Sequence, residues 1–298
     1  MPPSIRVPLA WAMLLAMPAF FAVNQLAARW VDFVPPHALA LGRWALASLF
    51  LLPFVGATLW RQRAAAWREA PYLLVLGALG MWVCGAFVYI GGRETTATNI
   101  ALIYAASPVG IVVIARLFLG ERLSWVRAAG VALCLAGLLL IIVKGEPWRL
   151  GAVRFSTGDL WVAVAASCWA AYSVLLKRWP TAFDPTARLA LISAAGCVVL
   201  LPFTVAEAAL VGPPRIDGAT LLTWVTLAIV PGIGAYACFA FCLRELGAGR
   251  AAVGMYLGPL YTVAMAWALL DEAPRWYHIA GAGLVLPGVF LATRAPKG

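Results

Sequence analysis

Charged side chains are scarce in this chain of 298 residues. Asp, Glu, Lys and Arg make up 11% of the sequence, whereas soluble proteins average about 25%. Hydrophobic residues make up 64%, and the mean hydropathy is +0.91. This composition excludes a disordered chain and argues against an ordinary water-soluble enzyme, because the surplus apolar surface needs a partner other than water. The sequence therefore predicts a protein that lies in a lipid bilayer.

Residues that usually carry enzyme chemistry are also few. His37 and His278 are the only histidines, and neither has a companion suited to metal binding or nucleophilic catalysis. All six cysteines fall inside apolar runs, which indicates core packing rather than a disulfide framework or a zinc site. No glycine-rich phosphate loop or Ser/His/Asp grouping stands out. We therefore predict that the protein is not an enzyme, binds no metal and needs no cofactor.

Acidic residues are missing from the middle of the apolar runs. All twelve lie in the gaps or near the ends of the runs. Buried carboxylates are the usual proton relays of membrane pumps, but the first run offers Asn24 and Gln25 instead. The sequence therefore gives no support to proton antiport through an intramembrane carboxylate, and facilitated diffusion, exchange and proton drive all stay open.

The apolar residues gather in ten runs, most of them long enough to cross the roughly 30 Å hydrocarbon layer as a helix. The first run is too long for the apolar region of a signal peptide, so it is counted as a span. The ten predicted spans are 8–29, 35–59, 70–91, 97–119, 125–143, 158–176, 185–210, 218–243, 250–270 and 276–293.

Basic residues show how these spans are oriented. The net charge of +10 comes from Lys and Arg in the short gaps, which favours a membrane topology signal over nucleic-acid binding. Alternate gaps and termini carry fourteen basic residues on one side and seven on the other. Because the more basic side faces the cytoplasm, we expect a multi-pass protein of the inner (plasma) membrane with both termini cytoplasmic.

The two halves of the chain resemble each other. Five spans per half is an odd number, so the second half, 151–298, must enter the membrane from the face opposite to the first, 1–150. The gaps agree, because three arginines follow the second span and one follows the seventh. This predicts an inverted repeat with the substrate near the midplane. The matching residues lie at offsets of 149–151: Leu51–Phe54 with Leu200–Phe203, Arg93 with Arg244, Pro108 with Pro259, and Glu121 with Glu272.

The stretches 99–108, 117–122 and 130–137 resemble the EamA-type repeat of the drug/metabolite transporter superfamily. The second copy, 251–288, is similar but looser. The resemblance covers essentially the whole chain, and within the superfamily the chain is most similar to aromatic amino-acid exporters of the YddG type. It implies an all-α integral membrane fold of ten transmembrane helices, arranged as two inverted five-helix repeats around a central cavity. Helices 1, 3, 4, 6, 8 and 9 would line that cavity.

Two prolines at corresponding positions interrupt predicted helices 4 and 9. Pro108 and Pro259 have no N–H, so the carbonyls of Tyr104 and Met255 would lose their donors. In a bilayer such carbonyls need another partner. These helix breaks are interpreted either as kinks that shape packing or as a polar ledge and bending point for the cargo.

Aromatic and polar residues converge from the helices that would line the cavity. Any one of these side chains could simply pack, but together they suit an amphipathic cargo with a flat apolar body. The candidate substrate-binding residues are Asn24, Trp82, Tyr89, Tyr104, Ser107, Trp169, Tyr172, Ser173, Tyr236 and Tyr256.

Arg43 is an exception among the charged residues, because it lies about 12 Å into the second span. It could meet a substrate carboxylate or extend its side chain outward to the interface, and we favour the interface. Glu121 and Glu272 end helices 4 and 9 and are interpreted as interfacial caps or salt-bridge partners.

The sequence thus predicts a secondary exporter of small amphipathic metabolites, amino acids including aromatic ones, that works by alternating access. Exporters of other drugs or metabolites and a channel-like facilitator are the alternatives. The expected partners are a small-molecule substrate and the lipid bilayer, with no nucleic acid, and the expected oligomeric state is a monomer.

Overall fold

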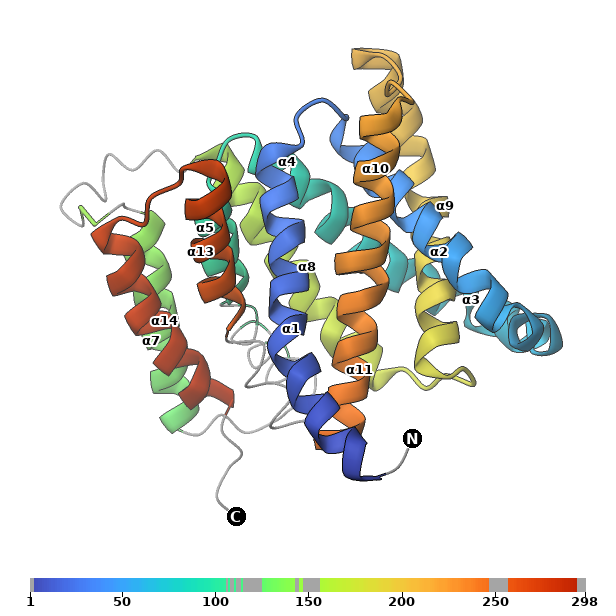
Figure 1. Cartoon of the computed structure of the whole chain (residues 1–298), viewed down its shortest axis with the longest axis horizontal. Coiled ribbons are helices and arrows are strands. Elements are labelled where there is room, and N and C mark those ends of the chain that lie inside the picture. The colour runs from blue at the N-terminus through green and yellow to red at the C-terminus, as the bar shows by residue number, and fades with distance from the viewer. Residues whose placement is uncertain are drawn as a thin grey trace.

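The computed structural model describes residues 3–105, 107, 110, 114, 125–142, 145–146, 156–246 and 257–293. Within these ranges the regular structure is helical, and six helices are long and apolar enough to cross a membrane. Figure 1 shows the helices as a bundle in which α1 begins and α14 ends at the same end.

The helices follow the predicted spans closely where the chain is described. The largest difference is at the third span, which begins at Arg63 rather than near residue 70, because α2 and α3 are separated by Gln62 alone. The first half contains α1 Pro3–Trp30, α2 Pro36–Arg61, α3 Arg63–Gly77, η1 Ala78–Phe87, α4 Val88–Gly92, α5 Ala97–Ala105 and α7 Trp125–Ile142. The second half contains α8 Thr157–Arg178, α9 Pro185–Val211, α10 Gly218–Leu227, η3 Ala228–Gly234, α11 Ala235–Leu246, α13 Gly258–Leu270 and α14 Trp276–Thr293.

Helix starts follow from local sequence. Proline occupies the first turn of both α2 and α9, where its missing N–H and fixed φ suit a helix start. Asp184 caps α9 by accepting hydrogen bonds from the N–H groups of Thr186 and Ala187 at 2.9 and 3.1 Å. Pro259 likewise stands in the first turn of α13. It therefore stands at the start of a described helix. Residues 247–256, Met255 among them, and Pro108 lie outside the described residues, so the two helix breaks stay a prediction.

Two membrane helices contain π-helical turns at corresponding places. The rod α3–η1–α4 includes ten π-helical residues, and the rod α10–η3–α11 includes seven, starting at Ala78 and Ala228. Pro231 lies inside η3, where its missing N–H disturbs the regular ladder. Insertions of this kind often occur at functional sites, because they change the direction in which side chains leave the helix.

Helix contacts in one half have counterparts in the other. Three pairs each join a helix to its own counterpart: α2 with α9, α7 with α14 and α5 with α13. α1 packs on α11 of the second half, and its counterpart α8 packs on η1 of the first. Small residues allow close approach: a Cβ added to Gly77 would lie 2.5 Å from the backbone nitrogen of Gly196. Large apolar side chains such as Phe54 and Leu210 face outward, more than four-fifths exposed, as expected of a lipid-facing surface.

One end of the bundle carries a set of carboxylates that cap helices belonging to the other half. Glu272, just after α13, accepts hydrogen bonds from the N–H groups of Ala97 and Thr98 at the start of α5, and pairs with Arg29 at 3.4 Å. We call this the Glu272 end. The prediction that Glu272 serves as a cap or a salt-bridge partner is confirmed, since it does both, and Glu121 lies outside the described residues.

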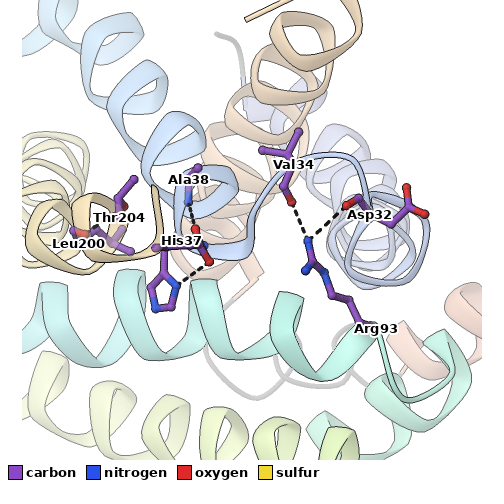
Figure 2. A network of polar contacts seen from close by, with 8 residues as sticks. Asp32, Val34, His37, Ala38, Arg93, Leu200 and Thr204 are labelled. Atoms are coloured by element: carbon purple, nitrogen blue, oxygen red, sulfur yellow. Dashed lines mark hydrogen bonds and ion pairs between the residues drawn. The ribbon is translucent and has the colours of Figure 1, made fainter. Parts of the chain in front are cut away.

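A second cap lies at the same end, where α2 begins. Glu207 of α9 accepts hydrogen bonds from the N–H groups of His37 and Ala38 at 2.9 and 3.1 Å, and its carboxylate contacts His37 Nδ1 at 3.0 Å. Figure 2 shows His37 and Ala38 in one view with Arg93, which donates to the carbonyls of Asp32 and Val34. The α1–α2 connection is therefore held to α4 and α9.

Glutamine at position 272 is expected to change how stability depends on pH. Burial raises the pKa of the Glu272 carboxyl above its ordinary value, and the hydrogen bonds from Thr98 and Ala97 and the Arg29 charge offset this only in part. The folded state therefore binds this proton more tightly than the unfolded state, and the stabilisation it gives fades as the pH rises through the raised pKa.

The measurement is thermal unfolding in detergent from about pH 4 to pH 7, a range that starts near the ordinary carboxyl pKa. The stability of the natural protein relative to Glu272→Gln should decline as the pH rises. A relative stability that grows with pH would contradict this reasoning.

Candidate functional site

Arg43 is buried in the middle of the bundle. Its side chain is on α2, about two turns from the helix start, and only 4% of the residue is exposed. The prediction that it extends to the interface is wrong. Asn24, Tyr89 and the Pro231 carbonyl offer hydrogen-bond acceptors within the bundle, so the guanidinium stays inside.

The Arg43 guanidinium and the side chains of Asn24 and Tyr89 form a closed set of hydrogen bonds. Arg43 Nη1 donates to Asn24 Oδ1 and to the Tyr89 hydroxyl, the latter at 3.0 Å, and Tyr89 in turn donates to Asn24 Oδ1 at 2.8 Å. Arg43 Nη2 donates to the Pro231 carbonyl in η3 at 3.4 Å. We call Asn24, Arg43 and Tyr89 the polar node. It joins α1, α2 and α4 of the first half to the π-helical turn of the second.

Aromatic rings pack next to the polar node. Tyr236 of α11 makes edge contacts with Phe21, Trp44 and Trp169, at centroid distances of 5.9, 6.3 and 6.2 Å. Tyr172 stacks on Trp169 at 5.3 Å. We call these five residues the aromatic cluster. Its members come from α1, α2, α8 and α11, so both halves contribute.

The polar node and the aromatic cluster touch through adjacent residues of α2. The Arg43 guanidinium carbon lies 4.4 Å from the centroid of the Trp44 ring, within cation–π range. Tyr104 of α5 is partly buried and packs against the core cluster that contains Trp44 and Tyr89. A positive charge, neutral hydrogen-bonding groups and flat apolar faces therefore lie together where helices of both halves meet.

Most of the predicted site residues that the structure describes belong to this site or border it. Asn24, Tyr89, Trp169, Tyr172 and Tyr236 are members, and Tyr104 adjoins them. Ser173 donates to the Trp169 carbonyl one turn earlier. The hydroxyl of Ser107 is buried and has no hydrogen-bond partner among the described residues. Tyr256 and Pro108 lie outside the described residues.

Trp82 is not part of this site. It stacks on Phe203 of α9 at 4.0 Å, and Phe203 in turn stacks with His37. Helical spacing predicts that Trp82 and Tyr89 share a face. The π-helical turns of η1 lie between them, however, and their larger number of residues per turn puts the two side chains on different sides.

Sequence reasoning missed Phe21, Trp44 and the Pro231 carbonyl. Trp44 follows Arg43 directly, so an arginine buried in an apolar run was itself a signal that the adjacent ring could be part of a site. Phe21 and Pro231 carry no such local signal, because their role depends on which helices pack together.

The described residues offer donors more readily than acceptors at this site. Arg43 Nε and the indole N–H of Trp44 are buried and have no hydrogen-bond partner there. No group of three or more His, Cys, Asp or Glu side chains gathers anywhere in the described part of the chain. The arrangement is suited to holding an anionic or zwitterionic small molecule against aromatic faces.

Comparison with known proteins gives the family. The profile of the EamA-like transporter family matches residues 9–143 and again residues 156–294. The chain belongs to the EamA-like transporter family. This EamA protein is a membrane transporter and not an enzyme, in agreement with the sequence prediction.

Several relatives are similar to this EamA protein over most of its length. An "Uncharacterized transporter" of Archaeoglobus fulgidus is 30% identical over 87% of this chain and 88% of its own. A "Probable terminal-alkyne amino-acid exporter" of Streptantibioticus cattleyicolor is 26% identical over 97% and 94%. A "Probable amino-acid metabolite efflux pump" of Escherichia coli is 28% identical over 58% and 59%. A solved crystal structure shares the fold, with a TM-score of 0.60 at 20% identity over 96% of this chain and 95% of that chain.

Proposed function

We propose that this EamA transporter exports amino acids, aromatic ones included, by alternating access between two inverted five-helix halves. The observation that carries the proposal is the contact between the polar node and the aromatic cluster at the junction of the halves. An amino acid presents a charged end and an apolar side chain a few ångströms apart. The site offers a matching pair of surfaces, joined at Arg43 and Trp44.

The names of two relatives point the same way, since one is called an amino-acid exporter and another an amino-acid metabolite efflux pump. At 26–28% identity a relative's name does not establish the substrate of this chain. The assignment of amino acids therefore rests on the side chains of the site. A phosphorylated cargo would call for several cationic side chains, whereas the described site contributes Arg43.

Three features support two inverted halves divided near residue 150. The family profile matches the chain twice in tandem. Contacts between helices in one half have counterparts in the other. π-Helical turns recur in the corresponding rods α3–η1–α4 and α10–η3–α11. Arg43 and Trp44 are almost fully buried, so cargo reaches them when the halves move apart at one end of the bundle.

The proposed setting is the inner (plasma) membrane, with both termini in the cytoplasm and the Glu272 end facing outward. The positions of the α1 start and the α14 end at one end of the bundle support this, together with the basic residues of the gaps. We propose a monomer as the transporting unit, because both halves that form the site belong to one chain.

The test is flux of a panel of amino acids in proteoliposomes that contain the purified protein. Saturable flux is expected for aromatic and other apolar amino acids, and unlabelled amino acid on the opposite side should accelerate it. No saturable flux for any amino acid would remove this substrate class. Flux that neither saturates nor responds to cargo on the other side would favour a channel-like facilitator.

A further inference from the structure

We propose that Arg43 binds the carboxylate of the cargo, so that the transporter selects molecules with a free carboxylate and rejects their amides and amines. The inference rests on the proposed function and assigns the part of the amino acid that the site recognises. Arg43 then determines which cargo is bound, in addition to linking helices through its hydrogen bonds.

The first argument is charge. Arg43 is 4% exposed, and the groups that accept its hydrogen bonds are an amide oxygen, a phenol and a backbone carbonyl, all neutral. Among the described residues Arg43 has no ion-pair partner, since the pairs of Arg29 with Glu272 and of His37 with Glu207 do not include it. A buried guanidinium without an anionic partner is costly in the low dielectric of a membrane protein, and a bound carboxylate would supply that partner.

The second argument is the supply of donors. Arg43 Nε and Trp44 Nε1 are both buried and without hydrogen-bond partners in the described structure. They belong to consecutive residues of α2, and the guanidinium lies over the indole ring at 4.4 Å. Two buried N–H donors without partners, one of them charged, leave hydrogen bonds that a bound acceptor could supply. A carboxylate has two oxygens and pairs with guanidinium through parallel hydrogen bonds.

The third argument is the position of the rings. Tyr236 makes an edge contact with Trp44 and another with Trp169, and the Arg43 guanidinium lies over the Trp44 ring. A cargo whose carboxylate meets Arg43 can therefore place a flat side chain among these rings. In the structure the neutral Asn24 Oδ1 accepts a hydrogen bond from the guanidinium. A bound carboxylate would displace this acceptor.

The experiment measures competition for uptake in proteoliposomes. The labelled cargo is the amino acid with the highest saturable flux, for example phenylalanine. The competitors are then phenylalaninamide and phenethylamine, which lack the carboxylate, and 3-phenylpropionate, which keeps it and lacks the amine. We expect 3-phenylpropionate to compete about 10- to 100-fold better than either amine, the range set by losing hydrogen bonds to a charged group.

Arg43→Gln separates recognition from structure. If Arg43 binds the carboxylate, this variant loses the preference for 3-phenylpropionate over phenethylamine, and the ratio of their inhibition constants approaches one. If Arg43 only held helices together, Arg43→Gln would lower flux and thermal stability but leave the ratio of inhibition constants unchanged. That result would overturn the proposal.

Asn24→Asp is the second variant and serves if Arg43→Gln does not fold. This variant places a carboxylate where a neutral oxygen now accepts a hydrogen bond from Arg43. The new carboxylate should pair with the guanidinium in place of the cargo and raise KM for the amino acid by about 10- to 100-fold. Asn24→Ala is the matched control, because it removes the neutral contact without adding charge, and its KM should rise far less. Equal KM values for the two variants would contradict the proposal.

The outcomes also separate this proposal from the proposed function. Equal competition by all three analogues, with saturable amino-acid flux intact, would overturn the role of Arg43 and leave the exporter in place. No amino-acid flux would overturn both.

Discussion

Alanine in place of Tyr236 is expected to lower the kcat/KM of aromatic amino-acid flux by about 10- to 100-fold. Tyr236 holds the aromatic cluster together through contacts with Phe21, Trp44 and Trp169. Each aromatic contact is worth about 0.5–1.5 kcal/mol beyond burial, and truncation removes the ring face that the cargo side chain would use. The measurement is initial uptake in proteoliposomes over a range of cargo concentrations.

Two variants control for general damage. Tyr236→Phe keeps the ring and removes only the hydroxyl, so its kcat/KM should stay within about threefold of the natural protein, as expected if the ring contacts dominate. Phe54→Ala removes a ring that is 82% exposed on the lipid side of α2, and flux should be unchanged. Normal flux through Tyr236→Ala would show that the aromatic cluster does not hold the cargo.

Alanine in place of Gly92 is expected to destabilise the protein by about 3 kcal/mol, the upper part of the usual range for overpacking. A Cβ at this position would lie 2.0 Å from the backbone oxygen of Ala28. Backbone cannot rotate away as a side chain can, so α4 and α1 would have to separate. Asn24 lies on α1 and Tyr89 on α4, so the same movement would also weaken the polar node.

The measurement is the thermal unfolding midpoint in detergent, which should fall by roughly 5–10 °C for this loss of stability. Gly283→Ala is the matched control. Gly283 is also within a helix, but a Cβ there would meet no atom of the described residues within 4 Å. Its midpoint should be unchanged or slightly higher, because alanine favours helix more than glycine does. Equal midpoints for the two variants would mean that α1 and α4 are not in contact at Gly92.

Helix positions could be predicted from the sequence because each depends on local composition. The predicted spans 185–210 and 276–293 match α9 and α14 to within a residue. Proline and aspartate at the starts of α2, α9 and α10 act through their own backbone and neighbours, and long apolar runs need no tertiary partner to be recognised.

The site could be predicted only in part, because its geometry depends on contacts between distant residues. Helical spacing predicts Tyr89 and Trp169, and the repeat offset predicts Tyr236; the structure places all three in the polar node or the aromatic cluster. Arg43 was misplaced, since its choice between the interior and the interface depends on Asn24 and on the Pro231 carbonyl, which is 188 positions away. Trp82 was grouped with Tyr89 because α-helical spacing does not reveal the π-helical turns between them.

An experimental structure of the transporter with a bound aromatic amino acid is the most direct test of the account. We predict that the carboxylate will lie against Arg43 and the Trp44 indole N–H, with the side chain among Tyr236 and Trp169 at the junction of the two halves. An amino acid that binds elsewhere, with the polar node and the aromatic cluster unchanged around it, would contradict the central claim.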